Sequence, residues 1–417
     1  MAMRFLLGLL IVCLVFSGRA VEQSNVAAKA VNALGLDLLK TATKADQNAL
    51  LSPYSIQVAL AMTYAGSDGV TRSEMGQALH YPKDEAALHD SFSVLAGQLK
   101  TVTDQSAKYA AQIKKAGGRS TPISINVANR LFGQVDYKFQ PEFLEVLKSK
   151  YAAGLDSVNF AKNPTTAAER INTWVAKQTQ DRIRNIISPG SVTELTRLVV
   201  VNAIYFRAPW SSEFKEDVTK PQDFQRGDKT KIKVPTMYQQ HAFGYARREG
   251  FTVVTLPYRD PQLQFVILLP DRSNTLTAVE QRLSAQLLAD CAEMENAELK
   301  LYLPRFKFEP PSLALSQSLK GLGMKSAFSD SANFSRMTIA AKSAPLCVSE
   351  VFHKTFFSLN ERETEAAAAS AITMTPLGMH RAPENLIEVR VDRPFLFAVQ
   401  HRGSGACLFL GRLVNPN

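Results

Sequence analysis

Apolar side chains recur with helical spacing in the first part of the chain and with strand-like spacing in the rest. Residues 25–45 and 54–64 place apolar residues every three or four positions, and Ser52-Pro53 is typical of a helix start. Asn172 to Ile187 predicts a further amphipathic helix. Leu195 to Phe206 is apolar at most positions, which favours a central strand buried on both faces.

Strand-like runs follow one another in the second half of the chain. They are Lys231–Val234, Thr252–Leu256, Leu263–Leu269, Leu299–Pro304, Cys347–Leu359, Ile387–Val391 and Phe395–Val399. Helices are expected to dominate the first 155 residues. No linker, low-complexity tract or fixed-period repeat divides the chain, so we predict one α+β domain over residues 21–417.

The first twenty residues have the pattern of a secretory signal peptide. Arg4 precedes an apolar stretch from Phe5 to Phe16. The next four residues, Ser17-Gly18-Arg19-Ala20, are mostly small, as at a signal-peptidase cleavage site, and cleavage is expected after Ala20. About twelve apolar residues are fewer than the roughly twenty needed to span a bilayer, which disfavours a membrane anchor. The sequence therefore predicts a secreted, extracellular protein, or a periplasmic one in a Gram-negative bacterium.

The mature chain is predicted to be moderately basic. Loss of Arg4 and Arg19 reduces 48 Lys and Arg to 46, against 38 Asp and Glu, which leaves a net charge of +8. Such a charge modestly favours binding to polyanions. It affects solubility and the rate of encounter with charged partners rather than the fold. Three cysteines remain, Cys291, Cys347 and Cys407, which is too few for a disulfide scaffold. Stability must therefore come from the core.

Motif searches give no complete catalytic or metal site. The chain has no His-Glu-x-x-His, no Cys-x-x-Cys, no Gly-x-Ser-x-Gly elbow and no phosphate-binding glycine loop. Ser212-Glu213-Phe214-Lys215 fits Ser-x-x-Lys, but the Ser-Asp-Asn and Lys-Thr-Gly partners are missing. We therefore predict a protein that is not an enzyme and that needs no metal or cofactor.

Residues 360–384 form a small-residue run followed by a Pro- and Gly-broken stretch, between two strand-like runs. The run is small enough to be either an exposed helix or a narrow strand. In a strand, one face would consist of Thr364, Ala366, Ala368, Ser370, Ile372 and Met374. Glu363 and Glu365 would lie on the other, outward face. The first face carries nothing larger than threonine before Ile372, so it can enter a sheet without side-chain collisions.

Motifs spread over nearly the whole mature chain resemble those of the serpin family. They are Asn48–Ile56, Ile171–Val175, Val201–Phe206 with Trp210, Leu256–Tyr258, Pro304–Phe306, Asn333–Met337, Phe352–Lys354, residues 361–371, Arg393–Phe397 and Phe409–Pro416. The resemblance implies a fold of three β-sheets and about nine helices. It also implies an exposed reactive loop, over about residues 361–384, that joins two strands.

In inhibitory members of that family a serine protease cuts the loop and is held as an acyl-enzyme while the loop enters the central sheet. The resemblance therefore implies a suicide inhibitor of secreted serine proteases. The alternative is a non-inhibitory serpin that acts as a carrier, storage protein or chaperone. Glu363 keeps this alternative open, because the inhibitory pattern has glycine at that position.

The family pattern also implies where the loop bends and where it is cut. The hinge residues are Glu361, Glu363, Thr364, Glu365, Ala366, Ala367, Ala368, Ala369 and Ser370. Counting from them places the reactive bond at Leu377-Gly378, which suits chymotrypsin-like or elastase-like proteases. Met379 and Arg381 are alternatives, and a cut after Arg381 would suit trypsin-like enzymes.

Further roles follow from the same resemblance. Ser52, Ser55, Asn202 and His353 correspond to a polar cluster where the strands of the central sheet must part, here called the shutter cluster. Trp210 corresponds to the residue where the loop enters the sheet, here called the breach.

Basic residues Lys108, Lys114, Lys115 and Arg119 lie in a segment whose counterpart in some serpins binds sulfated polyanions, although Gly117-Gly118 favours a plain solvated loop. Asn333-Phe334-Ser335 is a glycosylation sequon, which has meaning only in a eukaryotic secretory pathway. The expected partners are therefore serine proteases and, at most, a sulfated polyanion, with no nucleic acid and no membrane span.

Overall fold

The structure is a computed structural model that describes residues 26–339, 345–364 and 386–416. Residues 1–20, which carry the predicted signal peptide, lie outside this range. So do most of the predicted hinge and the predicted reactive bond, including Leu377, Gly378, Met379 and Arg381.

Nine α-helices lie in the described part of the chain. They are a helix over residues 26–41, α2 (Pro53–Ala65), α3 (Gly69–Ala78), α4 (Glu85–Lys115), α5 (Pro141–Tyr151), α6 (Pro164–Gln178), α7 (Leu276–Arg282), α8 (Ala285–Asp290) and α9 (Ser316–Gly321). Two short 3-10 turns, η1 (Glu216–Val218) and η2 (Ser326–Phe328), complete the helical elements. No helix within the described ranges is long and apolar enough to cross a membrane.

One long sheet, here called the central sheet, forms the middle layer of the molecule. Its strands, in spatial order, are β10 (Phe306–Phe308), β12 (Val348–Leu359), β13 (Glu363–Thr364), β4 (Leu198–Pro209), β2 (Ser124–Gln134) and β3 (Leu155–Val158), and β11 (Leu313–Ala314) pairs with β12. The short strand β13 separates β12 from β4 only at one end. Along the rest of their length, β12 and β4 pair directly with each other and run parallel.

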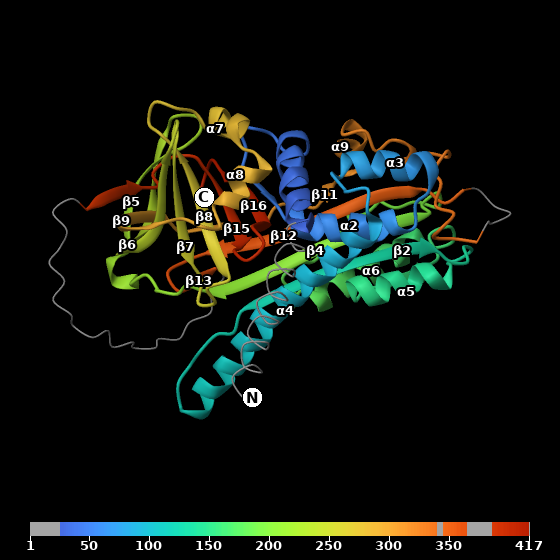
Figure 1. Cartoon of the computed structure of the whole chain (residues 1–417), viewed down its shortest axis with the longest axis horizontal. Helices are drawn as coiled ribbons and strands as arrows, with labels where there is room; N and C mark the ends of the chain where they lie inside the picture. The colour runs from blue at the N-terminus through green and yellow to red at the C-terminus, as the bar shows by residue number, and fades with distance from the viewer. Residues whose placement is uncertain (1–25, 340–344, 365–385, 417) are drawn as a thin grey trace, which may run out of the picture.

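A second set of strands packs at one end of the central sheet (Figure 1). In spatial order it contains β1 (Ala49–Leu51), β16 (Ala406–Leu413), β15 (Phe395–His401), β8 (Leu263–Pro270), β7 (Phe251–Pro257), β6 (Lys231–Arg248), β9 (Asn296–Pro304) and β14 (Ile387–Arg390), with β5 (Lys220–Gln225) beside β6. The first part of β6 pairs with β5 and β9, and its last five residues pair with β7, so β6 connects two groups of strands within this sheet. The expected α+β fold is confirmed, with nine helices among the described residues. The described strands form two sheets rather than the expected three, because β6 pairs with both β9 and β7 and so joins two sets of strands into one sheet.

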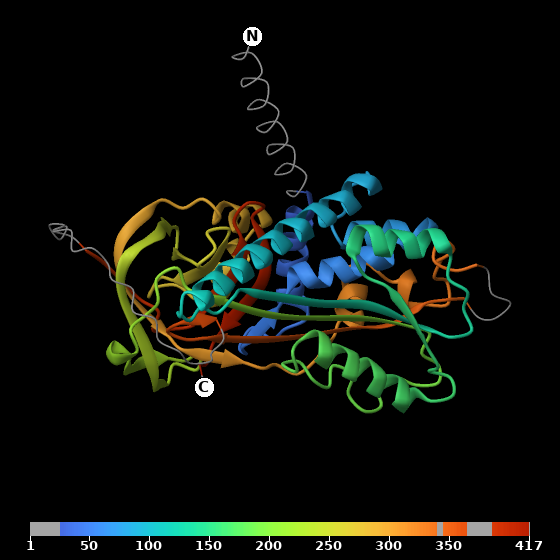
Figure 2. The ribbon, with the colours of Figure 1, turned by 90° about the horizontal axis from the view of Figure 1, so that it is seen from below.

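Strand β4 buries both of its faces because helices cover the central sheet on both sides (Figure 2). Side chains such as Val200 and Phe206 enter the main core beneath α2, whereas Val201 and Tyr205 enter a second core beneath α6. This two-sided burial explains the nearly continuous apolar run predicted for this strand.

Several predicted boundaries differ from the structure; the strand expected at Lys231–Val234, for example, continues to Arg248. The helix expected from Asn172 to Ile187 ends at Gln178, because the chain adopts positive φ angles at residues such as Gln180 and Asp181. Strand β4 begins at Leu198 rather than Leu195, and it continues to Pro209 because its last two residues pair with β13.

The three cysteines in the part of the chain that the structure describes are free. Cys291 and Cys407 are buried and Cys347 is half-buried. Burial raises the pKa of the Cys291 thiol to about 12, so this thiol stays protonated at neutral pH.

Candidate functional site

The four residues of the shutter cluster meet at the middle of the central sheet. Asn202 on β4 and His353 on β12 are opposite each other in the parallel register, and Ser52 and Ser55 lie at the start of α2 beneath them. Each of the four side chains is almost completely buried. The structure therefore brings together residues that are far apart in the sequence.

Hydrogen bonds link the cluster into one network. The backbone N–H of Ser52 donates to Nε2 of His353 at 3.1 Å, and Nδ1 of His353 contacts Oδ1 of Asn202. The Ser52 hydroxyl donates to the Leu408 carbonyl at 2.6 Å and also caps α2 by accepting from the N–H of Ser55. The network therefore ties the pair β4–β12 to a helix terminus and to β16.

The pattern of partners fixes the protonation state of His353. Because Nε2 accepts a hydrogen bond, Nδ1 must carry the ring proton and donate it to Asn202. Complete burial disfavours the charged ring and lowers the pKa of His353 to about 3. The imidazole is therefore neutral at physiological pH.

Asn129 on β2 is a fifth member of the cluster that the sequence analysis missed. It lies opposite Asn202 in the β2–β4 register, its Oδ1 accepts from Asn202 and from Ser55, and its Nδ2 donates to the Ser55 carbonyl at 3.1 Å. The sequence could have indicated Asn129 only if the register between β2 and β4, which places it opposite Asn202, had been known in advance.

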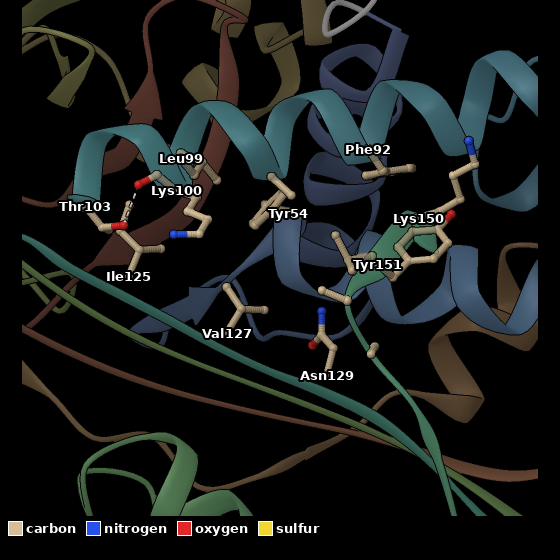
Figure 3. Close-up of a pocket in the computed structure, with 14 residues that line it drawn as sticks. Tyr54, Phe92, Leu99, Lys100, Thr103, Ile125, Val127, Asn129, Lys150 and Tyr151 are labelled. Carbon is tan, nitrogen blue, oxygen red and sulfur yellow. Dashed lines mark hydrogen bonds between the residues drawn. The ribbon is translucent and has the colours of Figure 1, made fainter. Parts of the chain in front are cut away.

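A pocket of about 280 Å³ opens beside Asn129, between α4, α5 and β2 (Figure 3). Figure 3 shows the rings of Tyr54 and Phe92 and the side chain of Val127 around it, with Asn129 at its inner side. Packing around β2 is incomplete here, which leaves this strand room to shift.

Lowering the pH should destabilise the protein through His353. The unfolded chain takes up this proton near pH 6.5, while the folded protein does so near pH 3, so this contribution to stability is complete above pH 6.5. It is lost as the pH falls through that window, at up to about 1.4 kcal/mol per pH unit. Urea unfolding midpoints between pH 7.5 and 4.5 measure the slope.

A His353→Gln variant should show a shallower pH dependence than the wild-type protein. Burial also lowers the pKa of His401, to about 4, so some slope should persist in this variant and His401→Gln serves as the comparison. Parallel curves for the wild-type and His353→Gln proteins would contradict the assignment.

At the breach, Trp210 lies beneath the first residues of the hinge. Its ring stacks on Tyr258 at 4.8 Å between ring centroids, and its Nε1 donates to the Asn360 carbonyl at 2.8 Å. The Trp210 N–H donates to the Arg362 carbonyl at 3.0 Å. The buried indole thus positions the turn that follows β12.

The hinge turn is closed by Asn360 and held by the carboxylate of Glu361. Oδ1 of Asn360 accepts from the N–H groups of Arg362 and Glu363, at 3.0 and 3.2 Å. Glu361 is buried, accepts from Thr219 at 2.9 Å and lies 3.6 Å from the Arg305 guanidinium.

After this turn, β13 lies between the ends of β12 and β4. Thr364 pairs with Leu359 of β12 and with Ala208 of β4, and Glu363 pairs with Pro209, all antiparallel. The expectation that Glu363 faces outward is wrong in this structure, because its side chain is only 3% exposed. The tight turn places Glu363 opposite Pro209 at the end of β4, while Thr219 and the N–H of Phe214 donate to Glu361.

The basic residues predicted to attract a polyanion lie on the surface. Lys108, Lys114 and Lys115 are exposed on the last turns of α4, and Arg119 is exposed in the loop after it. Lys114 and Lys115 are well placed to stabilise the negative end of the helix dipole. No comparison with known proteins supports a polyanion ligand. Within the described ranges, no group of His, Cys, Asp and Glu residues is arranged to hold a metal ion.

Comparison with known proteins extends over nearly the whole chain. The family model described as Serpin (serine protease inhibitor) matches residues 29–416. Leukocyte elastase inhibitor from Bos taurus is 37% identical over 91% of this chain and 97% of its own length. Serpin B6 from Pongo abelii is 34% identical over 94% of this chain and 100% of its own. The crystal structure of uncleaved ovalbumin superposes with a TM-score of 0.79, at 30% identity, over 93% of this chain and 99% of that one.

The predicted secretion is contradicted by these comparisons. Leukocyte elastase inhibitor and serpin B6 are serpins of the intracellular type, so the localisation inferred from residues 1–20 is withdrawn. A short apolar run after one arginine is a compositional signal only. It carries less information here than similarity over some 390 residues of folded chain.

Proposed function

The chain belongs to the serpin family, and we propose that it inhibits serine proteases as a suicide substrate. In this proposal the protease cuts the reactive loop and forms an acyl-enzyme, and the freed loop inserts between β12 and β4. The observation that carries the proposal is the position of β13, which begins an antiparallel strand at the site of insertion. Serpin-family inhibitors are generally not catalytic enzymes, which agrees with the absence of an enzyme motif.

Continuing the register of β13 gives the inserted loop a definite place in the sheet. Because Thr364 lies opposite Ala208 and Leu359, Ala366 would lie opposite Phe206 and Phe357. These even-numbered positions face the main core, which has no space for large side chains before the sheet opens. The small residues on this face suit that environment.

The odd-numbered face would also be buried, against the second core. The same register places Ala367 opposite Tyr205 and Phe356, and both of these residues pack beneath α6. The run of alanines at consecutive positions therefore has a physical reason. An inserted strand in this sheet must be narrow on both sides.

Ser370 would arrive at the shutter cluster. Six steps beyond Thr364, the register sets Ser370 between Asn202 on β4 and His353 on β12. Insertion breaks the direct contact between those two side chains, and a serine hydroxyl can donate to one partner and accept from the other. This placement lets the buried network exchange hydrogen bonds instead of losing them.

The same register supports Leu377 as the residue before the reactive bond. The first residue of β4, Leu198, would lie opposite Met374, so only Thr375 and Pro376 separate the filled sheet from Leu377. A cut after Arg381 would add four residues of slack, about 13 Å, between the sheet and a captured protease. A shorter connection would exert a stronger pull on the captured protease. A leucine before the cut bond also suits chymotrypsin-like or elastase-like proteases.

Incubation with chymotrypsin or elastase, followed by denaturing electrophoresis, tests the proposal. The expected result is a covalent adduct of protein and protease, together with a released fragment whose first residue is Gly378. Cleavage without an adduct would instead support the alternative of a non-inhibitory serpin. The observation that favours this alternative is Glu363, because a buried carboxylate at the hinge makes the movement of the turn costly.

Arg207 is expected to accelerate insertion by pairing with Glu365. The register places these residues opposite each other, and Nε of Arg207 is buried without a hydrogen-bond partner among the described residues. Arg207→Glu should raise the number of inhibitor molecules consumed per protease about fivefold, and adding Glu365→Arg should restore part of the loss. If the double variant is as impaired as the two single changes combined, the pairing is refuted.

A further inference from the structure

A cleft lies between α6 and the loop that leads from this helix to β4. Ala168 and Asn172 of α6 line one side, and Pro189 and Leu195 of the loop line the other. The cleft has a volume of about 850 Å³, against about 280 Å³ for the pocket beside Asn129, so it is large enough for a drug-sized molecule. Helix α6 lies on the face of the central sheet away from α4 (Figure 2), so the two cavities are on opposite faces. We call this cavity the α6 cleft.

Hydrogen bonds and buried side chains hold the two sides of the cleft in place. The Asn172 side chain donates from Nδ2 to the Ile187 carbonyl and accepts from the Ile187 N–H at Oδ1, each at 2.9 Å. Farther along the loop, the N–H of Thr193 donates to the Thr196 hydroxyl at 2.9 Å. The side chains of Ile187 and Val192 are buried in the second core beneath α6. The cleft is therefore largely preformed, which reduces the entropy that binding a ligand would cost.

Apolar side chains line the cleft although it opens to solvent. Leu195 is 78% exposed, the largest value among the exposed large apolar side chains of the described residues. Ala168 and Pro189 also line the cleft. A single exposed leucine is common on protein surfaces and needs no explanation. A leucine that lines a preformed cleft, however, allows the hydrocarbon part of a ligand to leave water.

Two carboxylates determine which charge a ligand of this cleft can carry. Glu169 of α6 and Glu194 of the loop both line the cleft and are exposed. Neither forms a salt bridge with a residue that the structure describes. Their basic neighbours in the sequence donate to backbone carbonyls instead, Arg170 to that of Ser157 at 3.3 Å and Arg197 to that of Glu194 at 2.9 Å. The two carboxylates would therefore attract a cationic ligand and repel an anionic one.

We propose that the α6 cleft binds a small amphiphilic amine, whose hydrocarbon rings contact Leu195 and whose ammonium group pairs with Glu169 or Glu194. An ammonium group carries N–H donors only and forms charge-assisted hydrogen bonds with carboxylates. Because the cleft opens to solvent, the bound charge stays partly hydrated and its desolvation costs little. The site is independent of the proposed inhibitory function, since no protease takes part in binding.

Isothermal titration calorimetry of the full chain at low salt, with diphenylpropylamine as the probe, tests this proposal. Diphenylpropanol, which has the same rings without the charge, should bind about fivefold more weakly, and diphenylpropionic acid more weakly still. Glu169→Gln and Glu194→Gln should each weaken binding of the amine about threefold and leave binding of the alcohol unchanged. Leu195→Ser should weaken binding of all three probes. Glu145→Gln, which removes an exposed carboxylate on α5 outside the cleft, is the matched control and should bind the amine like the wild-type protein.

Several results would overturn the proposed site. Absence of binding by the amine, or equal affinity for the amine and the acid, would contradict the ligand class. Wild-type affinity for the amine in the cleft variants would contradict the location, and so would a loss in Glu145→Gln as large as that in Glu169→Gln. The substituted side chains are exposed, so unchanged melting temperatures are expected and exclude a loss through misfolding. Failure of this test leaves the inhibitory function standing, because covalent adducts with proteases are measured separately.

Discussion

Replacing Ala368 by arginine should convert the protein from an inhibitor into a substrate of its target protease. In the extended register Ala368 lies opposite Ile204 and Thr355, on the face of β4 that enters the main core. An arginine there would carry an unpaired charge into the core, at a cost of several kcal/mol. Each 1.4 kcal/mol slows insertion about tenfold, so deacylation would be completed first.

The measurement is the fate of the protease in a titration followed by denaturing electrophoresis. We expect the adduct to disappear while cleavage at Leu377 continues at the wild-type rate, because the loop remains accessible. Ala382→Arg is the matched control. It makes the same chemical change in the same loop, but beyond Gly378, where the chain stays outside the sheet. An adduct in Ala368→Arg at wild-type yield would refute the proposed path of insertion.

Cleavage of the reactive loop should raise the melting temperature by more than about 20 °C. Before cleavage β12 and β4 pair directly and in parallel, which is the weaker arrangement of strands. The strands on either side of the loop, β13 and β14, belong to different sheets, so the proposed insertion requires the cut. After a cut, residues 365–374 could form an antiparallel ladder with each neighbour and bury Ile372 and Met374 in the main core.

Circular dichroism melting curves of the intact and cut protein measure this change. About 1 kcal/mol shifts the melting temperature of a domain of 150–250 residues by 2–4 °C and that of a longer chain by less, so a rise of 20 °C here corresponds to roughly 10 kcal/mol. The cut Ala368→Arg variant should melt close to its intact form, because its loop is barred from the core. A cut wild-type protein that melts within a few degrees of the intact one would argue against stored strain in the native sheet.

The sequence alone was sufficient for the fold and for most of the shutter cluster. Apolar periodicity located the long strand β4, and family motifs brought Ser52, Ser55, Asn202 and His353 into one expected group. These signals succeed because they are local, either as a spacing of side chains or as a short motif. The same local information misplaced the end of α6, since positive φ angles after Gln178 leave no trace in the apolar pattern.

Other features were decided only when distant segments were placed side by side. Asn129 joins the shutter cluster because β2 pairs with β4 in one particular register. Glu363 is buried because a turn closed by Asn360 pairs it with Pro209 at the end of β4, whereas the strand alternation alone predicted the opposite. The second core beneath α6 likewise became visible only in three dimensions.

The amino-acid sequence by itself thus determined the family, the order of helices and strands and the small side chains of the hinge. The tertiary structure decided which polar groups share hydrogen bonds, which carboxylates are buried and that β13 pairs between the ends of β12 and β4. The physical reason is that strand register and burial depend on contacts between residues hundreds of positions apart, whereas periodicity reports only on neighbours along the chain.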